Sequence, residues 1–329
     1  MKKEDFPRLS GKPVEEIDLR LRLEHLDQIV VHHRKFNELY EVIKDCHNFK
    51  KGAAILGDTG TGKSTLFKTY EKNFPKENRT KIINSHTIIY TATPVLLLEL
   101  DSNSKPQNVA SKMLQKLGDP LYNQGTEKIL TARLKQYLLT TDVELLIIDE
   151  LQHLIDTDTQ RVIRKAADWL KQLLNDVNLP IVFGGIKEDA INIFNSNRQL
   201  DERFPCKPDF FGFQYNSEEN IREFRGFLKS IDLQLPFADK SKIFDPYLAE
   251  KIYYATLGIS RTLNHLLHHS IKYALRAGKD RLEESDLEYG FSLLYLKTRP
   301  KVINPFDGKV FDLKVALDKE KRKNKLDGY

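Results

Sequence analysis

The stretch of the chain best suited to chemistry is residues 57–64, which read Gly-Asp-Thr-Gly-Thr-Gly-Lys-Ser. This is the complete G-x-x-x-x-G-K-S spacing of a loop that cradles phosphate groups. Its glycines let the backbone curl so that N–H groups point inward, Lys63 can reach the β- and γ-phosphates, and the Ser64 hydroxyl can hold Mg²⁺. The sequence therefore predicts a site for ATP and Mg²⁺. The expected nucleotide-binding residues are Gly57, Asp58, Thr59, Gly60, Thr61, Gly62, Lys63, Ser64 and Thr65.

The segments on either side of this loop are the ones that its geometry requires. Residues 53–56 form an apolar run, which predicts a buried strand, and residues 65–70 have the pattern of a helix. A helix that begins at Gly62 would add the positive end of its dipole to the anion site. The alternative is a chance glycine-rich turn, and the strand before the loop and the helix after it argue against that.

A second candidate element is the apolar run at residues 143–148, which ends in Asp149 and Glu150. A strand inside a parallel sheet is buried on both faces and turns polar only where it leaves the sheet. We expect Asp149 to hold Mg²⁺ together with Ser64, and Glu150 to polarise the attacking water as a general base. The alternative is a pair of carboxylates that only meets solvent. A position about 85 residues after the phosphate loop favours the catalytic interpretation.

Composition limits the class of protein. The chain has 329 residues, of which 40% are hydrophobic and 30% charged, so we expect a globular protein of two packed units with extensions. No apolar run approaches the roughly 20 residues of a membrane span, and residues 1–5 lack the apolar segment of a signal peptide. Cys46 and Cys206 are too few for a disulfide framework or a metal site. We therefore expect a cytoplasmic protein without membrane contact, whose net charge of +5 permits a polyanionic partner without requiring one.

Strand and helix patterns alternate through the first two thirds of the chain, which predicts a parallel sheet with helices on both faces. Strands are expected at residues 53–56, 145–149 and 180–184, with a further one within 81–92. The later pattern is helical only, and the basic run at residues 319–325 has few apolar anchors near it. The expected organisation is an N-terminal helical extension at 1–48, an α/β nucleotide-binding domain at 49–215, a helical lid domain at 216–298 and a basic tail at 299–329.

An α/β nucleotide domain followed by a helical lid is the layout of AAA+ ATPases. The fold class that we expect is therefore α/β, an AAA+ parallel-sheet P-loop domain followed by a small helical lid domain. Residues 199–204 resemble the AAA+ segment that carries an arginine finger, which implies that Arg203, or Arg198 as the alternate, reaches the γ-phosphate of a neighbouring subunit. A surface arginine at a helix end is the alternative. Residues 258–261 resemble the sensor-2 motif, which implies a γ-phosphate contact for Arg261.

One feature of that superfamily is missing from the sequence. AAA+ proteins usually place a polar sensor-1 residue at the end of the fourth strand, but here that strand ends in Phe183-Gly184-Gly185-Ile186. None of these side chains can orient a water molecule. We therefore expect slow, regulatory ATP hydrolysis rather than the rapid turnover of a motor.

A narrower resemblance is carried by His32-His33-Arg34, 57–64, 147–150, 152–154, 199–204 and the helix that begins near Arg261. On these residues the chain resembles the TnsC/TniB transposition regulators, and it looks most like the TnsC of CRISPR-associated transposons. The resemblance covers about residues 29–277 and implies ATP-dependent oligomerisation, as a ring or helix, around duplex DNA. It also implies contacts to a targeting complex and to a transposase.

Basic and polar residues near two expected helix starts give separate support for DNA contact. Backbone N–H groups at helix starts and lysine side chains can both bind phosphate. Such contact would be sensitive to salt and tolerant of sequence. A solvated helix surface is the alternative. The candidate DNA-binding residues are Lys105, Gln107, Asn108, Lys112, Thr126 and Lys128.

Two other functions fit parts of the same pattern. A replication initiator or helicase loader would share the AAA+ elements, but only about 50 residues follow Ala277, which leaves little room for a DNA-reading module. A STAND-type signalling ATPase would bind ATP to change partners and would not bind DNA. DNA-stimulated assembly distinguishes a transposition regulator from such a switch.

Overall fold

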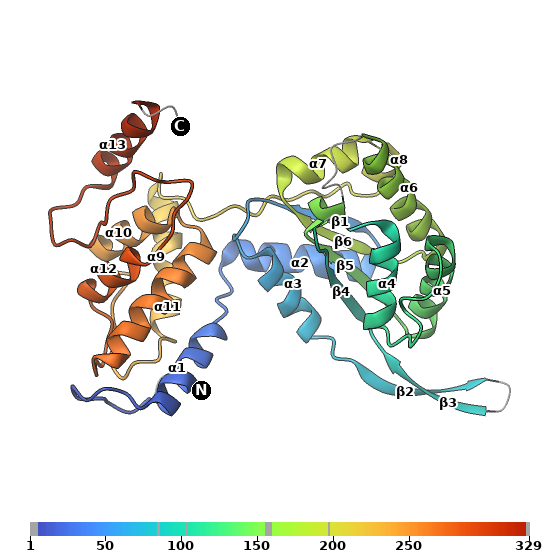
Figure 1. The fold of residues 1–329 in the computed structure, drawn as a ribbon, viewed down its shortest axis with the longest axis horizontal. Coiled ribbons are helices and arrows are strands. Elements are labelled where there is room, and N and C mark those ends of the chain that lie inside the picture. The colour runs from blue at the N-terminus through green and yellow to red at the C-terminus, as the bar shows by residue number, and fades with distance from the viewer. Residues whose placement is uncertain (1–5, 84–85, 103, 155–159, 197, 327–329) are drawn as a thin grey trace. The chain divides into compact units, whose positions relative to one another are not determined.

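Four apolar segments pair in parallel to form the central sheet of the structure, a computed structural model (Figure 1). The structure describes residues 6–83, 86–102, 104–154, 160–196 and 198–326. Beside the first strand, bridges from Ala53 to Cys206 and from Leu56 to Asp209 continue the sheet. In spatial order the strands are β1 (Gly52–Leu56), β6 (Ile181–Gly185), β5 (Leu145–Asp149) and β4 (Val95–Glu99).

Helices cover both faces of this sheet. Successive residues of each strand point to opposite faces, and the apolar side chains on both faces are buried. Ala53 and Ile55 of β1 pack with α2 (Arg34–Phe49) and α3 (Lys63–Lys72), whereas Ala54 and Leu56 belong to the apolar cluster on the other face. The buried parallel strands explain the continuous apolar runs of the sequence. The helices whose side chains belong to the cluster on this second face are α4 (Pro106–Lys116), α5 (Glu127–Thr140), α6 (Gln160–Val177), α7 (Lys187–Ser196) and α8 (Arg198–Asp201).

The strand expected within residues 81–92 is not part of the central sheet. It is β3 (His86–Ala92), which pairs antiparallel with β2 (Glu77–Ile83) in a separate hairpin. Ile82 and Ile89 of this hairpin are largely exposed. The core strand is β4, whose residues Val95–Leu98 are buried and which the sequence analysis missed. Both segments are rich in β-branched and apolar residues, so only packing distinguishes them.

The chain divides into two units, residues 35–211 around the sheet and residues 1–34 with 212–329, which are helical. The structure divides the chain after residues 34 and 211, whereas the sequence predicts boundaries after residues 48, 215 and 298. The difference arises because α2 packs on the sheet, whereas the preceding α1 (Glu16–Asp27) packs against α11 (Ser260–Arg276) of the helical unit. The other helices of this unit are α9 (Glu218–Asp232), α10 (Pro246–Thr256), α12 (Glu284–Ser292) and α13 (Leu313–Leu326). No helix of the described residues is long and apolar enough to cross a membrane.

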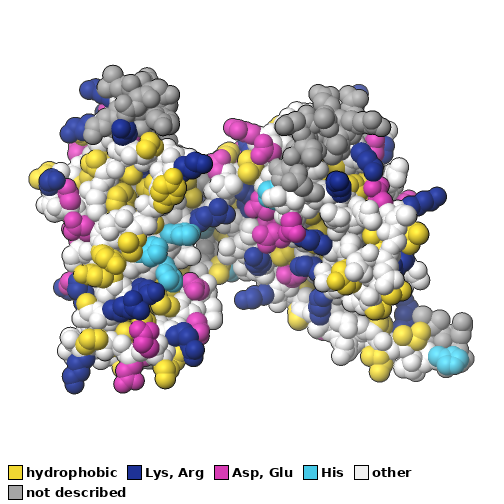
Figure 2. Space-filling model, in the orientation of Figure 1, with side chains coloured by type: hydrophobic (Ala, Val, Ile, Leu, Met, Phe, Trp, Pro, Cys, Tyr) yellow, Lys and Arg dark blue, Asp and Glu magenta, His cyan; other side chains and the backbone are white. Residues whose placement is uncertain are grey.

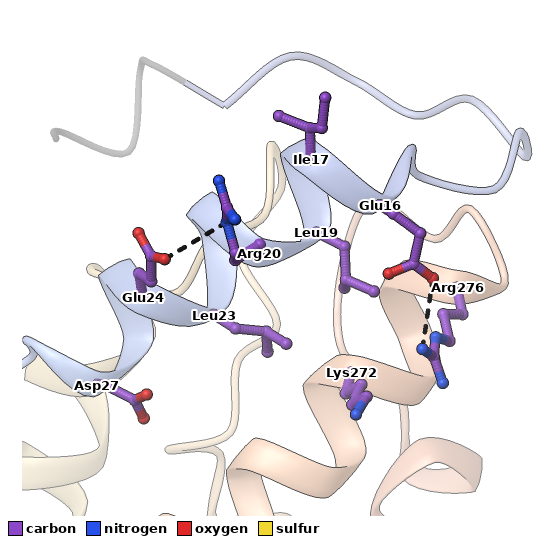
Figure 3. Close-up of a pocket in the computed structure, with 9 residues that line it drawn as sticks. All are labelled: Glu16, Ile17, Leu19, Arg20, Leu23, Glu24, Asp27, Lys272 and Arg276. Carbon is purple, nitrogen blue, oxygen red and sulfur yellow. Dashed lines mark hydrogen bonds and ion pairs between the residues drawn. The ribbon is translucent and has the colours of Figure 1, made fainter.

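A groove of about 560 Å³ lies between α1 and α11 (Figure 3). Leu19 and Leu23 form its apolar floor, and its rim carries charges of both signs. One ion pair joins Glu16 to Arg276 at 3.4 Å, and another joins Arg20 to Glu24 at 3.6 Å. The mixed rim does not favour a ligand of either charge.

Residues 299–326 are packed on the helical unit, although the sequence predicts a tail. Arg299 donates two hydrogen bonds to the carboxylate of Glu320, at 2.9 and 2.8 Å, and a third at 2.7 Å to the carbonyl of Tyr254. Leu313 and Ala316 bury the facing side of α13. The buried, bidentate pair supplies the anchor that apolar residues alone do not. The side chains of residues 323–325 lie outside the described residues.

The anchor of α13 gives a testable prediction. Arg299→Ala leaves Glu320 buried without its cationic partner, a loss of about 3–5 kcal/mol in buried pairs. We expect α13 to detach from α10, which would raise amide hydrogen exchange across residues 313–322 and lower the midpoint of thermal unfolding. Lys319→Ala, an exposed change on the same helix, should leave both unchanged. Equal protection of α13 in the two variants would contradict this role of Arg299.

Candidate nucleotide site at the phosphate loop

The phosphate loop connects β1 to α3, and its backbone depends on glycine at three points. Gly60 and Gly62 have φ values of 80° and 113°, in the left-handed region that favours glycine. A Cβ at Gly57 would lie 2.1 Å from the Phe210 carbonyl oxygen. Gly57 also donates a backbone hydrogen bond to Gly185 at 3.1 Å, which fixes the loop against the end of β6. The loop, with α3 beginning at Lys63, therefore has the curled shape and helix start predicted from the sequence.

Lys63 is buried, and its ammonium group lies over the loop itself. It donates hydrogen bonds to the carbonyl oxygens of Gly57 at 2.9 Å and Asp58 at 2.7 Å. Thr61, also buried, donates to the Asp58 carbonyl at 3.1 Å. Phosphate oxygens are charged acceptors and bind an ammonium group more strongly than neutral carbonyls do. The lysine is thus held inside the curl of the loop, where phosphates would compete for it.

Ser64 and Asp149, which the sequence assigns to Mg²⁺, are brought together from α3 and β5. The Ser64 hydroxyl donates to Asp149 Oδ2 at 2.6 Å, and the Glu150 backbone N–H donates to Asp149 Oδ1 at 2.8 Å. Burial raises the pKa of Asp149 above its ordinary value, and these two hydrogen bonds oppose that shift. Two hard oxygen groups side by side fit Mg²⁺, which takes few protein ligands and fills its shell with water and phosphate oxygens.

Glu150 follows Asp149 in an uncommon backbone conformation. Its φ is 58°, in the left-handed region that few non-glycine residues adopt. The side chain is half-buried and accepts a hydrogen bond from the side-chain amide of Gln152. The sequence marks Gln152 only as part of segment 152–154, which carries the family resemblance, and its contact with Glu150 was not predicted.

The absence of a sensor-1 side chain has a packing cause. A Cβ at Gly184 would lie 2.3 Å from the Phe67 ring and 2.5 Å from Asp149 Oδ1. Any side chain at this point of β6 would displace the carboxylate of Asp149. Glycine at this position avoids that displacement, and the polar group that contacts Glu150 is the side chain of Gln152.

The two candidate arginine fingers lie on the surface of the sheet unit. The Arg198 side chain is 91% exposed and forms an ion pair at 2.9 Å with Glu202 on the next turn. Arg203 is exposed and donates to the side-chain oxygen of Asn175. Neither is buried in the structure of its own unit, so each is available to another molecule.

Arg261 belongs to the other unit, where it is exposed on the first turn of α11. Its expected contact with the γ-phosphate stays a prediction. Three histidines follow it on the same helix, and Figure 2 shows histidine side chains gathered on this unit. Burial, aided by His268 and His265, lowers the pKa of His269. Among the described residues, no group of three or more His, Cys, Asp or Glu side chains is arranged to hold a metal ion.

The candidate DNA-binding residues gather at the starts of α4 and α5. Gln107 donates to the Gly125 carbonyl at 3.1 Å, which joins the two starts directly. Lys105 and Thr126 are the residues that precede these helices. Both basic and acidic side chains lie on the visible face of this unit (Figure 2). Exposed candidates are Lys105, Gln107, Asn108, Thr126 and Lys128, whereas Lys112 is half-buried and paired with Asp101.

Other basic residues of this region have structural partners. Lys116 donates to the Leu97 carbonyl at 2.7 Å, and Arg133 pairs with the buried Asp119. These contacts hold α4 to β4 and α5 to the preceding loop. They leave Lys105 and Lys128 as the lysines best placed for an external phosphate.

Comparison with known proteins identifies both the fold and a family. A family profile described as "Bacterial TniB protein" matches residues 24–208. No curated protein matches the chain.

Three solved structures have a similar fold. The Aeropyrum pernix ORC2 protein, in ADPNP–ADP complexes, is 14% identical with a TM-score of 0.59, covering 82% of this chain and 71% of that one. Cdc6p from Pyrobaculum aerophilum is 14% identical with a TM-score of 0.53, covering 86% and 69%. The Aeropyrum pernix ORC1 protein in complex with DNA is 14% identical with a TM-score of 0.51, covering 83% and 68%. At such identity the likeness shows the fold alone, and it confirms the expected α/β P-loop fold.

The buried carboxylate of Asp149 predicts a dependence of stability on pH. Its pKa is raised in the folded state, so ionisation of Asp149 destabilises the fold at neutral pH, and this loss disappears as pH falls through the raised pKa. Without nucleotide or Mg²⁺, Asp149→Asn should therefore raise the midpoint of thermal unfolding at pH 7 by a few degrees. The difference should shrink in acid. Asp45→Asn, an exposed change on α2, is the control. A lower midpoint for Asp149→Asn at pH 7 would mean that the carboxylate stabilises the fold.

Proposed function

The chain belongs to the TniB family of bacterial proteins, and we propose that it is an AAA+ ATPase that assembles on duplex DNA and recruits a transposase to the target site. The matched residues 24–208 include the phosphate loop, both strand-end carboxylates and both candidate arginines. Family membership confirms the resemblance to TnsC/TniB regulators. The assignment to the CRISPR-associated type stays a prediction.

The observation that carries the ATPase proposal is the hydrogen bond between Ser64 and Asp149. It joins a phosphate-loop hydroxyl to a carboxylate far away in the sequence, and both lie beside Lys63. In this arrangement Lys63 exchanges loop carbonyls for the β- and γ-phosphates, and backbone N–H groups of residues 60–64 bind the phosphate oxygens. Ser64 and Asp149 would hold Mg²⁺, which neutralises charge on those oxygens when it is bound.

Glu150 is the group that we assign as general base. It adjoins Asp149, is half-buried, and its carboxylate has acceptor positions beyond the one that Gln152 uses. A carboxylate held beside the γ-phosphate position accepts a proton from water as that water attacks. The missing sensor-1 group favours slow hydrolysis, so that the ATP-bound state persists.

Two substitutions test this assignment. Lys63→Ala should lower ATP affinity about 100-fold or more, because charge-assisted hydrogen bonds of about 1.5–3 kcal/mol each are lost. Glu150→Gln should keep ATP affinity and lower kcat about 10²–10⁴-fold, the usual contribution of a general base. Equilibrium binding of a fluorescent ATP analogue and phosphate release measure the two effects. Unchanged affinity in Lys63→Ala would contradict the phosphate-loop site, and parental turnover in Glu150→Gln would contradict the base.

The exposure of Arg198 and Arg203 favours a site shared between subunits, since an exposed arginine can bind the nucleotide of a neighbouring subunit. An arginine that stabilises charge on the transferred phosphoryl group is worth about 10³–10⁵ in kcat. We infer that Arg203, or Arg198, completes the site of a second copy in an ATP-dependent oligomer. Ring or helical assembly is the form that the family resemblance implies.

Mixing inactive variants tests the shared site. Arg203→Ala lacks the donated arginine and Lys63→Ala binds ATP too weakly to hydrolyse it, so a mixture should regain part of the parental ATPase rate. Parental specific activity should rise with protein concentration. Arg198→Ala tested in the same mixture identifies which arginine acts. Concentration-independent turnover without any rescue would indicate a site complete within one chain.

We propose that duplex DNA binds at the starts of α4 and α5. Two adjacent helix starts present backbone N–H groups, and Lys105 and Lys128 are exposed beside them. Lysine side chains and backbone N–H groups bind phosphate, so we expect contact to the DNA backbone. The transposase and the targeting complex are further partners that the family resemblance implies.

The DNA surface is tested by its salt dependence. Lys105→Ala with Lys128→Ala should weaken binding to unrelated duplexes equally and reduce the slope of log affinity against log salt by roughly one unit per lost phosphate contact. Lys112→Ala should have a smaller effect, because Lys112 is paired with Asp101. Lys51→Ala, an exposed change in the same unit, is the control. Full DNA affinity in the double variant would exclude this surface, and ATP-dependent assembly indifferent to DNA would favour a signalling ATPase.

A further inference from the structure

Gln152 lies between the proposed general base and the end of β6. It belongs to the short 3-10 helix η2 (Leu151–Leu154) and is 5% exposed. Its side-chain oxygen accepts the Ile186 backbone N–H at 3.1 Å, and its amide nitrogen donates to Glu150 Oε2. The side chain therefore bridges two parts of the site that are far apart in the sequence.

The orientation of this amide is fixed by its surroundings. A backbone N–H can only donate, so the group that faces Ile186 has to be the amide oxygen. The amide nitrogen then has to face Glu150, which as a carboxylate accepts. Both ends are satisfied, as a buried polar side chain requires.

The bridge reaches the phosphate loop through one peptide group. The Gly185–Ile186 peptide accepts a hydrogen bond from the Gly57 N–H with its carbonyl and donates to Gln152 with its N–H. Gly57 begins the phosphate loop, and Glu150 is the proposed base. Gln152 thus sets the carboxylate of Glu150 against the same strand end that holds the loop.

We propose that Gln152 is the positioning residue for Glu150, and that it supplies from η2 the polar group which the end of β6 lacks. Glycine is required at Gly184, because a side chain there would meet Asp149. Glu150 also has a left-handed backbone conformation, and the hydrogen bond from Gln152 holds its carboxylate in one direction. This inference rests on the proposed ATPase function.

Two substitutions at this residue separate its two hydrogen bonds. Gln152→Met keeps the length of the side chain and removes both bonds. Gln152→Glu keeps the acceptor for Ile186 and, at an alkaline pH at which its carboxyl is ionised, removes the donor to Glu150. Gln136→Met makes the same chemical change at an exposed position of α5 and is the matched control.

Steady-state ATP hydrolysis by the full chain, with binding of a fluorescent ATP analogue, is the measurement. We expect both Gln152 variants to lower kcat about 10- to 100-fold, the effect of a displaced catalytic group, while KM and analogue affinity stay parental. In a Glu150→Gln background, Gln152→Met should cause no further loss, because the group that it positions is already gone.

The outcomes distinguish this inference from the proposed function. Turnover that is absent in the parent would overturn the ATPase assignment itself, and parental turnover in Glu150→Gln would overturn the assignment of Glu150 as general base. With those intact, a parental or raised kcat in Gln152→Glu at alkaline pH, where the introduced carboxyl is ionised, would overturn the positioning role, as would losses that multiply in the double variant. If Gln152→Met unfolds at a lower temperature and loses analogue binding, the kcat of Gln152→Glu decides whether Gln152 positions Glu150.

Discussion

The burial of Asp149 is the constraint on which the end of the sheet depends. At 1% exposure, a carboxylate is tolerated only with hydrogen-bond partners, and Asp149 has the Ser64 hydroxyl and the Glu150 N–H. The neighbouring strand has to leave room for it, which explains Gly184. The ionised Asp149 carboxylate lowers the stability of the fold, and a bound cation would remove that cost, so this carboxylate is well suited to bind a cation.

Parallel pairing brings the parts of the site together. The strands β1, β5 and β6 all end at the same edge of the sheet, as parallel strands must, and ligands bind at that edge in open α/β sheets. Lys63, Asp149 and Glu150 therefore meet although the chain separates them widely. The same edge holds the peptide at Gly185, which contacts both the phosphate loop and Gln152.

Charged residues outside this edge fall into two groups. Some form ion pairs that stabilise the fold: Arg299 holds α13 to the helical unit, and Arg133 pairs with buried Asp119. Others, such as Arg198 and Lys105, are exposed and available to other molecules. Sequence gives both groups the same charge, and only burial and partners separate them.

The sequence by itself determined the phosphate loop, the strand-end carboxylates and the α/β P-loop fold, because these features depend on local backbone geometry and on residue type. The choice of β4 over the β2–β3 hairpin as a core strand, the docking of α13 and the place of Gln152 were decided by tertiary structure. In each case the deciding partner is distant in the chain: Leu145 and its neighbours for β4, Tyr254 for Arg299, and Ile186 for Gln152. A local pattern specifies what a segment can form, but which partner it meets depends on how the whole chain packs.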